Sequence, residues 1–432
     1  MSLTNSDLPA PKSPSAKLLT REQLAWVILL ASFTLCVLFS ILVPLGGNWY
    51  LHYASISQVA EVQGTSGTTL TKLPSRSDPI AIVGGSSKED VIEGSFLTTD
   101  ASSQALIVFF DGSAVTIFPN SKVTLSEMRR PRFGQSDQPN RIVLEVELGR
   151  VRVQLASATN RALHFEVQTP QSPGPHGGIL LEPASYASYA IEASNEVTHI
   201  SVRSGRAEVR GQTGHTITLE PNERAEIPLG AAANGPLPAK RNLLVNSNFR
   251  NPEMAFPISH GMLVAGWLAE SDQGGDGASV DGTVDVVTTG ATRAIHFVRR
   301  GSNNNHGETA VFQQLDKLVG DYLSLTLRFR VRIVEQSLGG GGEQSSEYPM
   351  IVRVDYKDND GNDRYWTQGF YYRNEAGYNI MNGTSIPRDT WFTFEANLKE
   401  VLDDLHLLKS IEFYSSGWDW NVYISEVELI AE

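Results

Sequence analysis

The residues of this chain best suited to recognise another molecule are aromatic, and they gather towards its C-terminus. Five of the seven tryptophans lie there with a group of tyrosines: Trp267, Trp366, Trp391, Trp418, Trp420, Tyr365, Tyr371, Tyr372, Tyr378, Tyr414 and Tyr423. An aromatic ring stacks on the apolar face of a sugar, and polar neighbours bond its hydroxyls. The pattern predicts a carbohydrate ligand, although we expect Trp267 and Trp391 to fill a core.

Two groups of rings supply the candidate ligand contacts. Trp418 and Trp420 are two positions apart, so the alternation of side chains along a strand would place both on one surface. Trp366, Tyr371 and Tyr372 form the second group. The alternative for each ring is packing in a core or capping of a strand.

The acidic run Asp358–Asp363 (DNDGND) resembles a calcium loop in composition. An EF-hand loop needs Gly at its sixth position and Glu at its twelfth. Counting from Asp358, these positions hold Asp363 and Gly369, so the match fails. We expect a solvated hairpin turn and no cofactor, with a structural Ca²⁺ left open but supported by no motif.

The sequence lacks the familiar catalytic and metal-binding spacings. Its nine histidines include no HExxH or H-x₃₋₅-H pair, which argues against zinc. It has no G-x-S-x-G, P-loop or G-x-G-x-x-G motif. A glycosidase carboxylate pair would be set by spacing in three dimensions, and nothing in the sequence nominates one. We therefore expect a protein with no catalysis of its own.

One segment of the chain is able to carry the rest on a membrane. Leu24–Leu45 holds twenty-two residues without a charge, and about 20 apolar residues span the hydrocarbon core. Lys12, Lys17 and Arg21 precede it, whereas 46–71 contains no lysine or arginine. The positive-inside rule places the N-terminus in the cytoplasm and the bulk of the chain outside. The alternative is a cleaved signal peptide, whose apolar region is usually shorter.

The composition excludes several kinds of partner and fold. The net charge is −13, so nucleic acid and anionic lipid surfaces are unsuitable partners. The single cysteine, Cys36, lies in the apolar segment, so the ectodomain has no disulfide framework. With 37 glycines and 21 prolines between short alternating runs, the chain is predicted to be mostly all-β.

The clearest alternation is in Leu325–Ile333, whose apolar residues should face a core while Arg328, Arg330 and Arg332 face water. Outside the anchor, we expect one short helix at 401–408 and a flexible loop tip at 339–342. The predicted divisions are a disordered cytoplasmic tail (1–23), a transmembrane helix (24–45), a stalk (46–78), a β-rich domain (79–228), a linker (229–241) and a C-terminal β-sandwich (242–432).

The β-rich domain at 79–228 carries an ordered set of motifs. Ala105–Leu125 gives an apolar strand, Asp-Gly-Ser, a second apolar strand and a Pro-Asn-Ser turn. Leu148–Val153 and Phe165–Pro170 add Gly-x-Val-x-Val and Val-x-Thr-Pro elements. This order resembles the extracytoplasmic domain of bacterial FecR-type proteins. Those regulators carry an anti-sigma region ahead of the membrane span, where this sequence has 23 residues, so the resemblance implies the domain rather than the regulatory role.

The C-terminal segment at 242–432 has a second set of motifs. Asn242–Phe249 with Gly266-Trp267, Glu308–Leu315 and Pro387–Phe394 together resemble the jelly-roll carbohydrate-binding modules of the galactose-binding-like class. The resemblance implies a jelly-roll sandwich with a carbohydrate ligand. Many such modules hold Ca²⁺ through an acidic residue near the first strand, and that position here is Asn248.

These observations predict a single-pass membrane protein of the bacterial cell envelope, with no enzymatic activity. Its C-terminal jelly roll would bind a glycan or another envelope polymer, and the FecR-like domain would act as a spacer or assembly module among other envelope proteins. The second hypothesis is a FecR-like transmembrane sensor or regulator. On the first hypothesis, replacing Trp418 and Trp420 by alanine abolishes binding and leaves folding intact.

Overall fold

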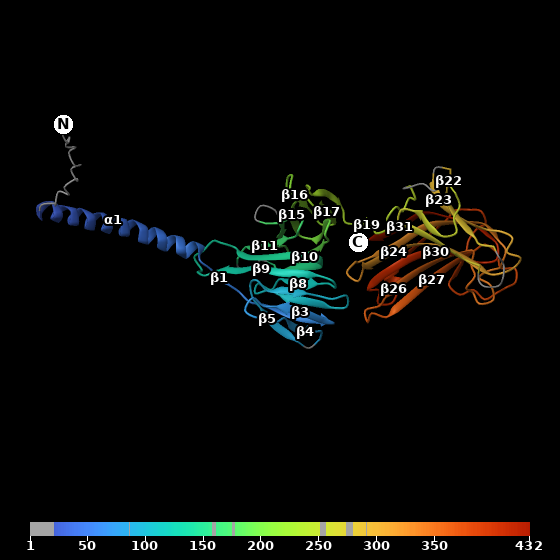
Figure 1. Cartoon of the computed structure of the whole chain (residues 1–432), viewed down its shortest axis with the longest axis horizontal. Helices are drawn as coiled ribbons and strands as arrows, with labels where there is room; N and C mark the ends of the chain where they lie inside the picture. The colour runs from blue at the N-terminus through green and yellow to red at the C-terminus, as the bar shows by residue number, and fades with distance from the viewer. Residues whose placement is uncertain are drawn as a thin grey trace, which may run out of the picture. The chain divides into compact units, whose positions relative to one another are not determined.

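The structure is a computed structural model that describes residues 21–432 apart from 86, 158–160, 175–177, 251–255, 274–279 and 291. After one long N-terminal helix the described chain is almost entirely β-strand (Figure 1), with one further helix of four residues. This confirms the predicted mostly all-β fold. The chain divides into two compact units. The first ends at Thr218 and also takes in Glu226–Ala233, and the second consists of Leu219–Ala225 and Asn234–Glu432.

Helix α1 (Arg21–Tyr53) contains the apolar segment and continues past its end at Leu45. None of its side chains is buried, which suits a helix whose apolar residues have no protein core to pack against. By length and composition α1 could cross a membrane, and a signal sequence would pass the same test. Pro44 lies within the helix without ending it.

The first unit is built on one strongly curved, barrel-like sheet. Its strands are β1 (Ser55–Ser57), β2 (Ala60–Ser66), β3 (Thr68–Lys72), β4 (Ile80–Val83), β5 (Lys88–Val91), β6 (Phe96–Thr98), β7 (Gln104–Val108), β8 (Ala114–Ile117), β9 (Lys122–Pro131), β10 (Asn140–Leu155), β11 (Leu163–Gln168), β12 (Gly178–Glu182), β13 (Ala187–Ala193), β14 (Val197–Ser204), β15 (Arg206–Arg210), β16 (Ile217–Leu219) and β17 (Glu223–Pro228).

The long strand β10 holds this sheet together because it changes partners at a glycine. Up to Leu148 it pairs with β9 and β11, and from Gly149 onward it pairs with β13 and β8. Gly149 has φ +95°, a conformation that costs L-residues energy and glycine little. A side chain at Gly149 would also collide with Ser121. The interruption visible in the sequence is therefore the bend that lets one strand serve two parts of the sheet.

The segment 46–78 was predicted to be a stalk, with a poorly ordered first strand as the alternative for 54–78, and the structure shows strands in place of a stalk. Its first residues complete α1, and the rest form β1, β2 and β3 of the barrel-like sheet. Val62 is fully buried and Ala60 is 2% exposed, so their side of β2 faces the core. Serine, threonine and glycine dominate the segment. Its few apolar residues alternate as in a strand, but there are too few of them for the sequence pattern to indicate one.

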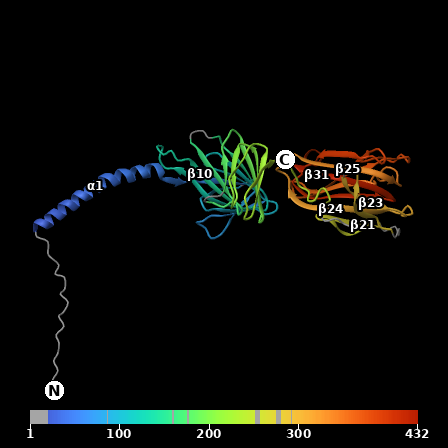
Figure 2. The same ribbon diagram turned by 90° about the horizontal axis from the view of Figure 1, so that it is seen from above.

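The second unit is a sandwich of two sheets, and Figure 2 shows its two layers. All strand pairs described in these sheets are antiparallel except one, which is parallel. Strand β18 (Asn234–Pro238) precedes the sandwich in the chain and belongs to the barrel-like sheet. One sheet contains β19 (Arg241–Asn242), β22 (Thr283–Thr289), β23 (Thr292–Arg299), β25 (Leu325–Gln336), β29 (Phe392–Asn397) and β31 (Trp420–Ala431). The other, seven-stranded sheet contains β20 (Gly261–Val264), β21 (Trp267–Asp272), β24 (Gly307–Leu318), β26 (Met350–Lys357), β27 (Asp363–Tyr371), β28 (Gly383–Ser385) and β30 (Leu407–Gly417).

Strand β25 forms one wall of the sandwich core as its alternation predicts. Its five apolar residues at odd positions are fully buried, whereas the three arginines between them lie outside the core. Phe329 is the centre of this wall, with ring centroids 5.6 Å from Phe370, 5.3 Å from Phe394 and 4.9 Å from Phe413. These contacts join both sheets through one ring.

The short helix lies earlier than predicted. Helix α2 (Leu398–Val401) precedes the expected 401–408, because Asn397 caps it by accepting a hydrogen bond from the backbone N–H of Lys399. The chain then turns and enters β30 at Leu407. Asn397 therefore marks the start of this helix in the sequence, four residues before the predicted start at 401.

The substitution Phe329→Ala is expected to lower the free energy of unfolding of the second unit by about 3–5 kcal/mol, because it leaves a cavity at the centre of the core. Thermal unfolding of the full chain in detergent micelles measures the change. Arg328→Ala, its neighbour on the opposite face of β25, is the control and should cost about 0.5 kcal/mol or less. Equal stability of the two variants would contradict this packing.

Candidate functional site

The second unit presents a large sheet surface whose side chains point away from the core. We call this side of the seven-stranded sheet the outer face. On β30, Ile411 and Phe413 are fully buried in the sandwich core. Glu412 and Tyr414 alternate with them and therefore lie on the outer face, half-buried. The same alternation places Arg353 of β26 beside them.

Strand register brings the outer-face residues into rows across five strands, β21, β24, β30, β26 and β27. One row contains Leu268, Phe312, Glu412, Arg353 and Thr367. The next row contains Glu270, Ala310, Tyr414, Ile351 and Gly369. Neighbouring strands lie about 4.8 Å apart, so each row extends about 19 Å. Glu412 and Tyr414 occupy the middle strand of both rows.

Glu412 is the electrostatic centre of the outer face. Burial raises the pKa of its carboxyl to about 7, against the attraction of the Arg353 guanidinium. The carboxylates of Asp355, Glu308 and Glu270 raise the pKa further. Among the residues that the structure describes, none forms a hydrogen bond or ion pair with this carboxyl. The pKa of the Tyr414 phenol is raised as well, first by burial and then by neighbouring carboxylates.

A clamp of arginine, aspartate and tyrosine borders Glu412. The Arg353 guanidinium donates hydrogen bonds from Nε and Nη2 to Asp355, at 3.1 and 2.8 Å. It also lies 4.8 Å from the centroid of the Tyr365 ring, within range of a cation–π interaction. Ser410 donates a hydrogen bond to the same aspartate. The guanidinium holds Tyr365 in place, and that ring is 65% exposed.

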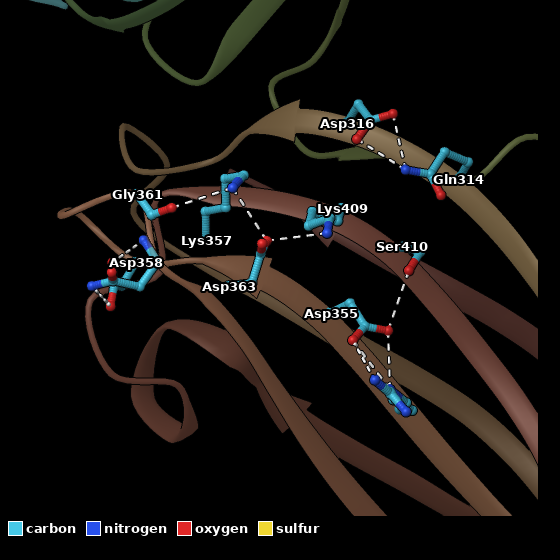
Figure 3. A network of polar contacts seen from close by, with 11 residues as sticks. Gln314, Asp316, Asp355, Lys357, Asp358, Gly361, Asp363, Lys409 and Ser410 are labelled. Carbon is cyan, nitrogen blue, oxygen red and sulfur yellow. Dashed lines mark hydrogen bonds and ion pairs between the residues drawn. The ribbon is translucent and has the colours of Figure 1, made fainter. Parts of the chain in front are cut away.

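The β26–β27 end of the outer face is a network of ion pairs, shown in Figure 3. Asp363 lies between two ammonium groups, 3.1 Å from Lys409 and 3.2 Å from Lys357. Hydrogen bonds from Lys409 and Lys357 lower the pKa of Asp363. This network fixes the hairpin at whose base Tyr365 lies.

Asp358, in the run compared with a calcium loop, is occupied by its own hairpin. It accepts hydrogen bonds from the backbone N–H groups of Asp360 and Asn362 and from the Arg364 guanidinium. Burial raises its pKa, but these hydrogen bonds outweigh burial and bring the pKa to about 2. Among the described residues, no group of three His, Cys, Asp or Glu could hold a metal ion.

At the opposite end of the outer face, the loop before β26 covers the sheet, and its Tyr348 ring packs against three glycines. Gly341, Gly369 and Gly383 surround the Tyr348 ring, and a side chain at any of them would collide with it. Tyr348 is 2% exposed and donates a hydrogen bond to the carbonyl of Met381. The prediction of a flexible loop tip at 339–342 is wrong, because three of its four glycines are buried and one of them, Gly341, packs against this tyrosine.

Trp420 does not lie on the surface, so its prediction as a ligand contact is wrong. It is 1% exposed and belongs to the sandwich core. The Arg299 guanidinium lies 5.3 Å from its ring centroid and donates hydrogen bonds to the carbonyls of Gly417 and Trp418. A core ring beneath a buried guanidinium has no free face for a ligand. Replacing it by alanine would disrupt folding rather than test binding.

Trp366 is also directed towards the inside of the sandwich. It pairs with the core residue Val354, packs against the core and stacks on Phe394 at 6.4 Å. Tyr372 packs against the core on one side and lies 5.3 Å from the Arg388 guanidinium on the other. Both rings stabilise the fold, although each keeps part of its surface exposed.

The other predicted rings have mixed placements. Tyr371 alternates onto the outer face, with its ring 6.1 Å from that of Tyr348, and stays a predicted contact. Trp418 lies in the half-exposed turn between β30 and β31, away from the rows of the outer face. Trp391 was expected in the core, and that prediction is wrong. It lies between the guanidinium groups of Arg330 and Arg332 on the opposite sheet, at 5.2 and 5.3 Å.

Sequence reasoning counted Tyr365 and Tyr414 among the C-terminal aromatic residues without choosing them as ligand contacts, and it named neither Glu412 nor Arg353. A signal was available, because the buried residues Leu408, Ile411 and Phe413 define the core side of β30 and leave the intervening residues outside. Which strands lie side by side could not be read from that alternation.

Comparison with known proteins gives distant similarities. No protein-family model and no curated protein sequence matches the chain. Among solved structures, a Parabacteroides distasonis protein assigned as an anti-sigma factor is 16% identical, with 36% of this chain and 69% of that chain covered and a TM-score of 0.26. The family 11 carbohydrate-binding module of a Clostridium thermocellum cellulosomal cellulase is 13% identical, with 42% and 96% covered and a TM-score of 0.25.

A family 61 carbohydrate-binding module, solved in complex with β-1,4-galactotriose, is 14% identical. The match covers 44% of this chain and 99% of that chain, with a TM-score of 0.25. At these TM-scores the similarities carry no argument about ligand or role, which must come from the site itself.

The substitution Glu412→Gln is expected to change the pH dependence of stability. The folded protein holds this proton up to about pH 7, whereas the unfolded chain releases it near 4.5, the ordinary pKa of a glutamate carboxyl. Stability therefore falls as the pH rises between these values. The variant should be about 3 kcal/mol more stable than the unmodified protein at pH 8, and nearly equal to it at pH 4. Thermal unfolding at both values measures this, with exposed Glu343→Gln as the control. An unchanged difference between pH 4 and 8 would contradict the assignment.

Proposed function

We propose that this chain is a membrane-anchored, non-catalytic protein that binds a glycan on the outer face of its seven-stranded sheet. The observation that carries the proposal is the exposed Tyr365 ring beside the unpartnered Glu412 carboxyl and the Tyr414 phenol. Aromatic surface for the apolar face of a sugar, next to hydrogen-bonding groups for its hydroxyls, is the combination that carbohydrate recognition requires.

The charges of the outer face favour some glycans over others. Glu412 faces three other carboxylates and one guanidinium. An anionic polysaccharide would be repelled by this arrangement, because like charges in a partly desolvated site disfavour binding. The ligand that fits is therefore neutral or cationic along the part that contacts Glu412. An envelope polymer with neutral sugars satisfies this requirement.

The proposal includes anchoring of the chain by α1. We infer that Leu24–Leu45 spans the bilayer, with the N-terminus in the cytoplasm and both β units outside. The first unit would then act as a spacer or assembly module that holds the second unit away from the membrane. The uncharged run Leu24–Leu45 and the two lysines and one arginine before that run support this orientation.

The second candidate function is transmembrane sensing, and one observation favours it. The C-terminal end of α1 is bound to the first unit rather than linked through a flexible stalk. Ser136 donates a hydrogen bond to the carbonyl of His52, and the Tyr50 ring packs edge-on to Phe133 at 5.6 Å. A displacement of the first unit could therefore be passed to the helix.

The substitution Tyr365→Ala is expected to weaken glycan binding about tenfold, which corresponds to about 1.4 kcal/mol. The stacking surface is lost, while the exposed position tolerates alanine. A glycan array of the full chain in detergent identifies a ligand, and titration calorimetry then measures its affinity. Tyr186→Ala is the matched control, since this tyrosine of the first unit is 91% exposed. Equal affinities of both variants would place the ligand elsewhere.

A further inference from the structure

The end of α1 extends beyond the apolar segment into the depth of the lipid headgroups. A helix rises about 1.5 Å per residue, so Asn48 and Trp49 lie about 4.5–6 Å past Leu45, and His52 and Tyr53 about 10–12 Å past it. The headgroup layer on each side of a bilayer is about 5–7 Å thick. On the anchoring proposed above, Trp49 therefore lies within this layer, and Tyr53 lies just beyond it on the water side.

The loop between β9 and β10 (residues 132–139) is bonded to the end of α1, so it lies at the same level of the membrane surface as Trp49 and Tyr53. Arg132 donates a hydrogen bond from Nη1 to the Tyr50 hydroxyl at 3.0 Å, and its backbone N–H bonds the carbonyl of Ala54 at 2.8 Å. Arg161 in turn holds the loop by donating to the carbonyls of Ser136 and Gln138. Helix and loop therefore form one built surface.

Between helix and loop lies a groove of about 540 Å³. Its lining includes Asn48, Trp49, His52 and Tyr53 from the helix and Asp137 and Gln138 from the loop. The Trp49 and Tyr53 rings stack with centroids 5.9 Å apart and are 64% and 58% exposed. Among the described residues, none forms a hydrogen bond or ion pair with the Asp137 carboxylate. The groove thus combines two aromatic faces with the carboxylate of Asp137.

We propose that this groove binds the ammonium headgroup of a phospholipid in the membrane that α1 crosses, an inference that rests on the proposed anchoring. An ammonium group is attracted both to the faces of Trp and Tyr rings and to a carboxylate. Leu45 at the membrane side of the groove gives the lipid an apolar border. The guanidinium of Arg132, which is bonded to Tyr50 next to Trp49 in the helix, has further N–H donors for the lipid phosphate.

The groove distinguishes this lipid from an anionic one by its charge. An anionic headgroup without an amine would meet the Asp137 carboxylate and lose the attraction of the two rings. Ethanolamine and choline headgroups both carry the required positive charge, so both should bind. The bound lipid would hold the first unit against the membrane surface in one orientation.

The experiment measures which lipids stay with the full chain. The protein is reconstituted in vesicles of equal parts phosphatidylethanolamine and phosphatidylglycerol, extracted in mild detergent, and its retained lipids are quantified by mass spectrometry. A parallel set replaces phosphatidylethanolamine by phosphatidylcholine. We expect the amine-bearing lipid to be enriched about threefold or more in both sets. Asp137→Asn and Trp49→Ala should reduce the enrichment to the composition of the vesicles, and exposed Asp90→Asn in β5 should leave it unchanged.

Each other outcome overturns a separate statement. Retained lipid at the bulk ratio, or enrichment of phosphatidylglycerol, overturns the ammonium site while leaving the anchor intact. Enrichment that survives in Asp137→Asn and in Trp49→Ala also overturns it, because Asp137 is exposed and its replacement leaves the fold unchanged. Failure of the unmodified protein to float with vesicles overturns the anchoring on which the site rests.

Discussion

The period of two along a β-strand is the constraint on which the rest of the second unit depends. One face of the seven-stranded sheet packs in the core around Phe329. Because side chains alternate along each strand, the remaining side chains lie on the opposite face, where they contact water or a ligand. Glu412 and Tyr414 are on the outer face because Ile411 and Phe413 are in the core. The core therefore fixes the site: a shift of one residue in β30 would exchange the two sets.

The electrostatics of the outer face follow from this placement. A carboxyl on a middle strand is shielded from water by neighbours on both sides, and burial raises its pKa. Arg353 cannot fully compensate, because its guanidinium is already bonded to Asp355 and lies over Tyr365. A fold selected only for stability would gain by replacing Glu412, as unpaired carboxyls in partly buried positions are costly. Its presence is consistent with a role in binding.

The first unit and α1 show the same dependence on backbone geometry. Gly149 allows β10 to serve two parts of the barrel-like sheet, since only glycine adopts its conformation at low cost beside Ser121. At the other end, the helix continues to Tyr53 and its side chains become part of the β unit. The junction is therefore a built contact rather than a tether, which is the basis of both the sensing alternative and the lipid groove.

The sequence by itself determined the apolar helix, the all-β class and the inward and outward sides of β25, because each depends on local composition or on a short periodicity. It missed β2 and β3 in the supposed stalk, where serine and threonine hide the alternation. Only the tertiary structure decided which aromatic rings are exposed. Trp420 lies in the core, whereas Trp391 is half-buried between two arginines outside it. Exposure depends on which strands become neighbours, and that pairing is set by contacts between residues far apart in the chain.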